Sequence, residues 1–386
     1  MTQLSAFAVR GKLLLGTHLE EGTLVVEDGL LTNVHRGHIR DGNLPETVID
    51  AAIISPGLID LQVNGAYGRE VTANPDDIDD ISRNLLSTGC TAWLPTVVTA
   101  PAEFYPPIFE GWLNHRVEAG AVPLGFHLEG PFISTEKKGA HRIECIEAAS
   151  EKLFESWLEQ ESILLVTLAP ERKGATGRIR RLTQRGVLVS LGHTNATYEE
   201  FVCGIDAGAR KATHLFNTMT SIHHRAPGAM VATLVDDRIT AGLIPDGVHS
   251  HPATIRLALK SKGADGIVIV SDMMSACGLG PGIYSLSTKQ VTVDATSARL
   301  ADGTLAGSIL TMDQALRNLV GWSDATPAEA LHMMTAVPAR LLGDEQRGRI
   351  VAGTRADLTL WDPALQPIRT IVGGRVGWER ERATTG

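Results

Sequence analysis

Four side chains that could carry metal-assisted chemistry stand at or near the ends of short apolar runs. Glu129 closes the run 122–129, His193 closes the run 187–193, His214 lies within the run 211–216, and Asp272 closes the run 266–272. Two imidazoles and one carboxylate, with a coordination position left open for water, are the ligand set of a catalytic zinc or similar divalent ion. The pattern therefore predicts a metal site, if these runs are strands that end at one place.

Each of these residues also has an ordinary structural interpretation. A single histidine at a strand end is more often a hydrogen-bonded structural residue, and Asp272 could simply cap a following helix. Glu129 could form a salt bridge, since a buried carboxylate needs a partner. The coincidence of all four residues at the ends of apolar runs favours a common site.

The elements that must position these side chains alternate in the middle of the chain. Apolar runs cover 53–61, 91–98, 122–129, 163–169, 187–193, 211–216, 240–245 and 266–272, and helical periodicity covers 76–87, 147–158, 174–184, 198–207 and 252–262. This order predicts an α/β fold, a closed (β/α)8 TIM-like barrel whose active site lies at the carboxyl ends of the strands. An open doubly wound sheet is the alternative, but no G-x-G-x-x-G follows the first run.

The two ends of the chain have a different pattern, with short strand-like runs instead of helices. Glu27-Asp28-Gly29 between two such runs indicates a hairpin, and similar runs flank Gly373-Gly374. We expect residues 1–53 and 345–386 to form one small β-sandwich domain and residues 54–344 to form the catalytic barrel.

Composition excludes several classes of function. The chain of 386 residues has a formal charge of -9, which argues against nucleic acid or an anionic membrane as a partner. No apolar stretch has the length of a signal peptide or a membrane span. The four cysteines form no C-x-x-C pair, so a zinc ribbon or redox motif is not expected. We expect a cytoplasmic protein.

Several motifs carry a family resemblance. Pro56-Gly57-Leu58-Ile59-Asp60, the two histidines, Asp272 and Ala356-Asp357-Leu358 are similar to the amidohydrolase superfamily. More narrowly, the chain resembles the N-acetylglucosamine-6-phosphate deacetylase family through motifs that occur in order along almost its whole length. These motifs are residues 61–65, 127–132, 138–141, 192–194, 213–219, 246–249, 271–272 and 305–308.

The resemblance implies hydrolysis of the acetamide of N-acetylglucosamine 6-phosphate to glucosamine 6-phosphate and acetate, in amino-sugar catabolism and cell-wall recycling. Glu129, His193 and His214 would hold the metal, whose bound water is the nucleophile. Asp272 would act as general base and then general acid, and His141 would polarise the acetyl carbonyl.

The first run carries Gln62 and Asn64 where relatives in the superfamily usually have two histidines. Amides are poorer ligands than imidazole for a transition metal, and the run 163–169 has no lysine that could bridge two ions. We therefore expect one divalent ion per subunit, zinc in the first place, with iron, cobalt or manganese as alternatives. Gln62 and Asn64 could hold a minor second ion or hydrogen-bond water.

The resemblance also implies contacts to the sugar phosphate. Arg225 and His249 would bind the phosphate, and Arg225 could come from a neighbouring subunit of a homodimer or homotetramer. The sugar would contact Ala140, His141, Asn217, Thr218, Leu305, Ala306 and Gly307.

Two other functions remain open. One is a different amidohydrolase that acts on a cyclic amide, and the other is a non-catalytic sensor of sugar phosphates. The sequence leaves undecided the physiological metal, the range of N-acetylhexosamine 6-phosphates accepted, the oligomer size and the role of the cysteines.

Overall fold

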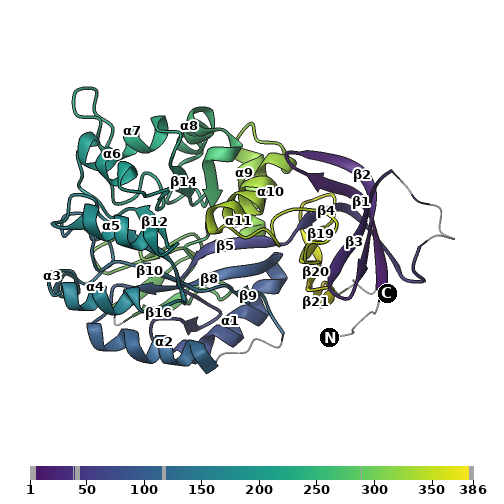
Figure 1. The fold of residues 1–386 in the computed structure, drawn as a ribbon, viewed down its shortest axis with the longest axis horizontal. Coiled ribbons are helices and arrows are strands. Elements are labelled where there is room, and N and C mark those ends of the chain that lie inside the picture. Colours follow the sequence, from purple (N-terminus) through teal and green to yellow (C-terminus); the bar gives the residue numbers. More distant parts are fainter. Residues whose placement is uncertain (1–5, 38, 40–43, 115–118, 288, 382–386) are drawn as a thin grey trace.

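Eight parallel strands form a barrel at the centre of the larger part of the molecule (Figure 1). The computed structural model describes residues 6–37, 39, 44–114, 119–287 and 289–381. Hydrogen bonding follows the chain order of the strands, and an isolated bridge between Val63 and Met273 joins the first strand to the end of the last. The strands are β5 (Leu58–Val63), β8 (Cys90–Val98), β10 (Phe126–Glu129), β11 (Ile163–Leu168), β12 (Leu188–Leu191), β13 (Lys211–Ala212), β14 (Thr240–Leu243) and β15 (Ile267–Ile269). The predicted (β/α)8 barrel is confirmed.

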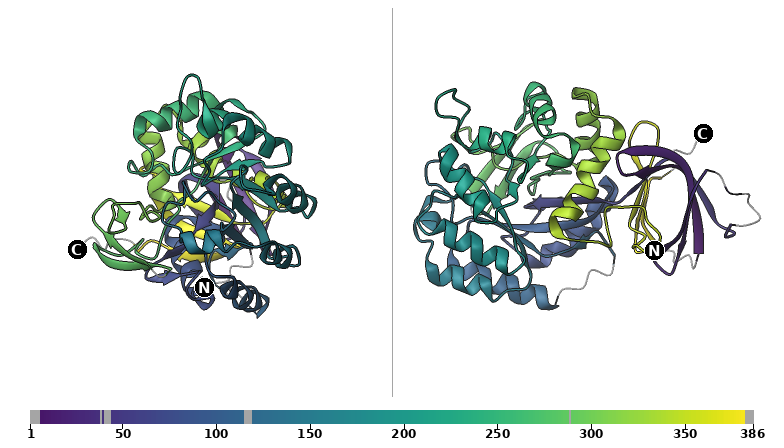
Figure 2. Two further views of the ribbon diagram at one scale, coloured as in Figure 1. Left: turned by 90° about the vertical axis from the view of Figure 1, so that its left-hand side faces the viewer. Right: turned by 45° about the horizontal axis from the view of Figure 1, so that its top comes forward.

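Helices surround the barrel (Figures 1 and 2). Several begin at side-chain caps that the sequence supplies, for example the capping box of Thr197 and Glu200 before α6. The helices are α1 (Ile78–Leu85), α2 (Tyr105–Asn114), α3 (Ile143–Glu147), α4 (Glu151–Leu158), α5 (Ala175–Gln184), α6 (Tyr198–Asp206), α7 (Gly228–Val235), α8 (Pro252–Lys262), α9 (Met312–Trp322), α10 (Pro327–Met334) and α11 (Ala336–Leu342). They overlap all five predicted helical segments.

Five of the barrel strands end earlier than their apolar runs, and three of these, β12, β13 and β15, end shortly before a functional residue. The backbone turns into the left-handed region at His193, His214 and Asp272, with φ of 46°, 30° and 52°. A residue in that region cannot continue a β-ladder, so each ladder stops before the functional residue. The three side chains consequently stand on tight turns just beyond the strands, at the carboxyl rim of the barrel.

Both chain ends build a second sheet that stands beside the barrel (Figure 2). Its order is β21-β20-β19-β4-β1-β2-β3, and one buried cluster joins residues of β1 and β2 to residues of β19 and β20. The domain is therefore one seven-stranded sheet with a core of its own, where the sequence analysis predicted a sandwich of two sheets. Its strands are β1 (Ala6–Leu15), β2 (His18–Glu27), β3 (Leu30–Arg36), β4 (Val48–Pro56), β19 (Leu358–Trp361), β20 (Pro367–Val372) and β21 (Arg375–Glu379).

Antiparallel strands that the sequence analysis did not predict follow the last barrel strand. They form a three-stranded sheet of β16 (Gly282–Leu286), β17 (Lys289–Val293) and β18 (Ala298–Arg299). A separate antiparallel pair, β6 (Gly65–Ala66) with β7 (Arg69–Glu70), follows the first barrel strand. The short β9 (Val122–Pro123) pairs with β8. The three-stranded sheet is an insertion near the carboxyl rim, and Lys289 Nζ at its second strand donates to the carbonyl oxygen of Ala140 at 2.8 Å.

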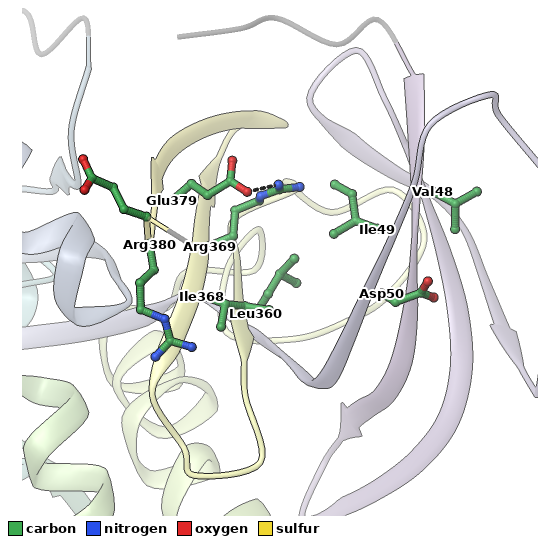
Figure 3. Close-up of a pocket in the computed structure, with 9 residues that line it drawn as sticks. Val48, Ile49, Asp50, Leu360, Ile368, Arg369, Glu379 and Arg380 are labelled. Atoms are coloured by element: carbon green, nitrogen blue, oxygen red, sulfur yellow. Dashed lines mark hydrogen bonds and ion pairs between the residues drawn. The ribbon is translucent and has the colours of Figure 1, made fainter. Parts of the chain in front are cut away.

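The small β-sheet domain contains a cavity of about 610 Å³ lined by β4 and the strands β19 to β21 (Figure 3). Apolar side chains of Ile49, Leu360 and Ile368 line it together with the ion pair of Arg369 and Glu379. None of the predicted site residues is among its lining residues.

Within the described part of the chain, no helix has both the length and the apolar character needed to cross a membrane.

Candidate active site

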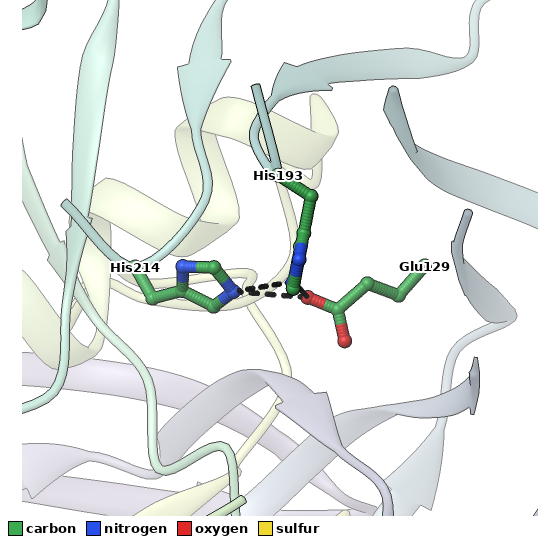
Figure 4. Close-up of side chains that lie close together, drawn as sticks. All are labelled: Glu129, His193 and His214. Carbon is green, nitrogen blue, oxygen red and sulfur yellow. Dashed lines mark hydrogen bonds and ion pairs between the residues drawn. The ribbon is translucent and has the colours of Figure 1, made fainter. Parts of the chain in front are cut away.

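Glu129, His193 and His214 converge at the carboxyl rim (Figure 4). Glu129 Oε1 lies 3.2 Å from His214 Nε2 and 3.4 Å from His193 Nε2, and the two Nε2 atoms are 3.1 Å apart. A tetrahedral ion with bonds of about 2.0–2.1 Å separates its ligand atoms by about 3.3 Å. The three side chains therefore fit a single divalent ion, and they are the only metal-ligand cluster among the residues that the structure describes.

The surroundings of the cluster orient its ligand atoms. His193 Nδ1 is 2.9 Å from the carbonyl oxygen of Lys137, so this nitrogen carries the hydrogen and Nε2 presents its lone pair to the cluster. Burial would raise the pKa of Glu129, but the neighbouring imidazoles of His193 and His214 hold it well below its usual range. A carboxylate that stays ionised while buried is suited to bind a cation.

Asp272 lies beside the cluster and is held by two amides. Its Oδ1 accepts hydrogen bonds from Gln62 Nε2 at 3.0 Å and from Asn64 Nδ2 at 2.8 Å. Gln62 Nε2 also donates to Glu129 Oε1 at 3.0 Å. Burial and the charge of Glu129 raise the pKa of Asp272 to about 6. The next helix in the described chain is α9, which begins at Met312, so Asp272 caps no helix and the capping interpretation is wrong.

His141 lies beside Glu129 and His193. Its Nδ1 is 2.7 Å from Thr99 Oγ1, and its Nε2 is 3.9 Å from Glu129 Oε2. Burial and the neighbouring His193 lower the pKa of His141 to about 3, so the imidazole is neutral near pH 7. The contact with Thr99 fixes the ring and leaves Nε2 toward the cluster.

A cavity of about 230 Å³ opens above these groups. It is lined by most of the predicted site residues, namely Asn64, Glu129, Ala140, His141, His193, His214, Asn217, Thr218, His249, Asp272, Leu305 and Gly307. Sequence reasoning did not assign the other lining residues, which are Val98, Gly139, Leu286, Arg299, Gly303 and Thr304. The cavity thus collects residues from seven barrel strands or the loops after them and from the three-stranded sheet.

Two predicted substrate contacts lie outside the cavity lining. Ala306 is fully buried, and its backbone N–H donates to the carbonyl oxygen of Ala298, so it supports the turn instead of facing the cavity. Arg225 is exposed, and its Nη1 lies 2.8 Å from His224 Nε2. This chain therefore does not bring its own Arg225 into the cavity that it forms.

His249 lines the cavity and pairs with a carboxylate. Its Nδ1 is 2.6 Å from Asp246 Oδ2, and Asp246 Oδ1 accepts the backbone N–H groups of Val248 and His249. Burial alone would lower the pKa of His249, but the hydrogen bond and charge of Asp246 outweigh it and hold the pKa above the usual value. The Asp246 carboxylate thus favours the positively charged form of the imidazole.

Two buried charges beneath the cavity were not singled out from the sequence. Lys211 is fully buried, and no described residue hydrogen-bonds its Nζ. Burial lowers the pKa of Lys211 to about 8, and burial raises the pKa of Asp60 to about 6. A lysine inside an otherwise apolar run was the available signal. Its positive charge offsets the repulsion among the carboxylates of Asp60, Glu129 and Asp272.

Known proteins resemble the chain over nearly its whole length. A model of the amidohydrolase family matches residues 53–377. An N-acetylglucosamine-6-phosphate deacetylase of Danio rerio is 34% identical over 391 residues, with 96% of each chain covered. An N-acetylgalactosamine-6-phosphate deacetylase of Escherichia coli O157:H7 is 36% identical over 375 residues, covering 93% of this chain and 99% of that protein.

Solved structures also resemble the chain over nearly its whole length. A mutant N-acetyl-D-glucosamine-6-phosphate deacetylase from Mycobacterium smegmatis, in complex with N-acetyl-D-glucosamine-6-phosphate, superposes with a TM-score of 0.90. Its sequence is 32% identical, and the match covers 97% of this chain and all of that one.

Proposed function

Since the chain belongs to the amidohydrolase family, we propose that it hydrolyses the acetamide of an N-acetylhexosamine 6-phosphate, with N-acetylglucosamine 6-phosphate as the first candidate. The observation that carries the proposal is a single cavity that holds a metal-ligand cluster and Asp272 together with the His249–Asp246 pair. A cavity with these groups can accommodate a molecule that has an amide and an anionic group. Release of an amine and acetate would place the enzyme in amino-sugar catabolism.

Each residue of the site would have its own role in the hydrolysis of the acetamide. A divalent ion held by Glu129, His193 and His214 would supply Lewis acidity to a water and to the acetyl carbonyl. Asp272 Oδ2 makes no hydrogen bond to a described residue, because Gln62 and Asn64 both donate to Oδ1. Oδ2 is therefore available to accept the proton of the attacking water and to return it to the leaving nitrogen. His141 Nε2 would donate to the developing oxyanion.

We propose one ion per subunit, and zinc as that ion. Gln62 and Asn64 direct their NH2 groups at the carboxylates, which leaves them as supports of Asp272 and Glu129 instead of metal ligands. Histidine nitrogen with carboxylate oxygen suits zinc, although iron, cobalt and manganese accept the same donors. A sensor without catalysis would have no use for Asp272 beside the cluster. An enzyme for cyclic amides that relied on two ions would lack ligands for the second.

The first experiment measures acetate release from N-acetylglucosamine 6-phosphate, N-acetylgalactosamine 6-phosphate and unphosphorylated N-acetylglucosamine. The proposal expects stoichiometric acetate and free amine, with a strong preference for the phosphorylated sugars. Tight binding of a sugar phosphate with no acetate released from any of them would instead support the sensor.

His249 gives a prediction for the effect of pH. The phosphate of the substrate is a dianion above about pH 6, while His249 loses its positive charge as pH rises through its elevated pKa. The KM of the phosphorylated substrate should therefore rise as the pH is raised above the usual histidine pKa of about 6.5, and that of the unphosphorylated sugar should stay flat.

The matched variant for this prediction is Asp246→Asn. Asparagine still accepts the backbone N–H groups of Val248 and His249, but it no longer holds the imidazole positive. The rise in KM should begin at lower pH in this variant. An unchanged pH profile of KM would remove His249 from phosphate binding.

Arg225 gives a prediction for the assembly. Because it lies outside the cavity of its own chain, we propose that it reaches the phosphate of a neighbouring subunit in a homodimer or homotetramer. Arg225→Ala should then cost about 2–4 kcal/mol with the phosphorylated sugar, which is roughly a 30- to 700-fold loss of kcat/KM. Sedimentation should show a dimer or tetramer for both proteins. A monomeric wild-type enzyme, or equal losses with both sugars, would contradict this role.

A further inference from the structure

The inserted three-stranded sheet places an arginine at the cavity. β18 ends at Arg299, and the turn that follows it brings Gly303 and Thr304 to the cavity lining together with Leu305. Arg299 is the only lysine or arginine that lines this cavity within the described part of the chain. The insertion therefore supplies the cavity with an arginine, which none of the barrel strands or the loops after them provides.

The guanidinium of Arg299 is held by its own hairpin. Its Nε donates to Ser297 Oγ at 3.2 Å, and its Nη1 donates to the carbonyl oxygen of Gly303 at 2.9 Å. Both acceptors are neutral, and no described carboxylate forms an ion pair with Arg299. None of the hydrogen bonds among the described residues uses Nη2. The side chain is thus fixed in place, while its charge is not neutralised and one nitrogen is available to a ligand.

Arg299 shares the cavity with His249. The charge of Arg299 opposes protonation of His249, which means that the two groups are close enough to interact. Two cations without a shared carboxylate repel each other, and an anion between them removes that repulsion. The Asp246 carboxylate does not neutralise Arg299, because it pairs with His249 alone.

We infer that Arg299 binds the phosphate of the substrate together with His249 and so determines specificity for phosphorylated sugars. This inference rests on the proposed function and adds to it a phosphate contact from the same chain that forms the cavity. Arginine suits the role because its planar fork of N–H donors matches phosphate oxygens. Two hydrogen bonds to the hairpin reduce the entropy that would be lost when the phosphate binds.

The test compares kinetics on N-acetylglucosamine 6-phosphate and on N-acetylglucosamine for the wild type, Arg299→Ala, Arg299→Lys and Ser297→Ala. Arg299→Ala should lose about 10- to 100-fold in kcat/KM with the phosphorylated sugar, mainly through KM, and less than about twofold with the other. Arg299→Lys should recover part of the loss, because it keeps the charge but not the fork. Ser297→Ala removes one anchor without removing charge and should have a small effect.

Results that differ from these expectations would lead to different conclusions about Arg299. Equal losses of Arg299→Ala on both sugars would make Arg299 a structural residue of the hairpin, and an unchanged preference for the phosphorylated sugar would overturn the inference outright. An Arg299→Lys protein no better than Arg299→Ala would contradict the role of charge. If the wild type releases acetate from no phosphorylated sugar, the proposed function itself fails. If the wild type prefers the phosphorylated sugar and Arg299→Ala keeps the same preference, only this inference fails.

Discussion

Replacing Asp272 by asparagine should lower kcat by about 10²–10⁴-fold, the usual cost of losing a general acid–base group. The asparagine oxygen can still accept the hydrogen bonds from Gln62 and Asn64, so the local structure should persist. Asparagine also tolerates the left-handed backbone found at this position, where φ is 52°. What the variant loses is the oxygen that accepts a proton.

Metal content and affinity for the sugar phosphate should therefore stay close to those of the wild type in Asp272→Asn. Asp313→Asn is a matched control, because Asp313 only pairs with Arg317 on α9 and its loss should leave kcat unchanged. A folded, metal-loaded Asp272→Asn enzyme with near-normal turnover would disprove the acid–base role.

Removing one ligand of the cluster should abolish both metal retention and activity. In Glu129→Gln the ionised oxygen that faces both imidazoles is lost, and in His193→Asn the imidazole is lost while the left-handed backbone is tolerated. We expect a loss of metal affinity greater than the 10–100-fold typical of an outer hydrogen-bond partner. Elemental analysis after dialysis measures it directly.

His251→Asn is the control for that experiment. His251 caps α8 by accepting the N–H of Ala253, and asparagine caps a helix at least as well. This variant should keep a full equivalent of metal and full activity. Full metal content in both Glu129→Gln and His193→Asn would show that the ion, if bound, is bound elsewhere.

The barrel and the metal cluster could be predicted from sequence for one physical reason. Parallel strands of a barrel end at the same rim, so residues that close separate apolar runs meet even when they are far apart in the chain. Glu129, His193 and His214 satisfy this condition and come within 3.4 Å of one another. The extent of several strands was overestimated, because apolar composition does not reveal the left-handed turns at His193 and His214. The run 53–61 also joined the end of β4, which belongs to the small sheet, to β5, which continues to Val63.

Contacts that depend on side-chain direction could not be predicted in the same way. Gln62 and Asn64 were considered as poor metal ligands or water partners, and the structure instead has them donate to carboxylates. Arg225 was assigned to the phosphate, but it is exposed in its own chain. Arg299 was missed because the antiparallel strands after β15 are short and carry no motif that distinguishes them.

Acetate release by one preparation of the wild-type enzyme, before chelation, after chelation and after addition of single divalent ions, tests metal-dependent deacetylation most directly. We predict that chelation removes activity on N-acetylglucosamine 6-phosphate and that one equivalent of zinc per chain, or of another ion that fits the cluster, restores it. Undiminished acetate release from protein shown by elemental analysis to hold no metal would contradict the account.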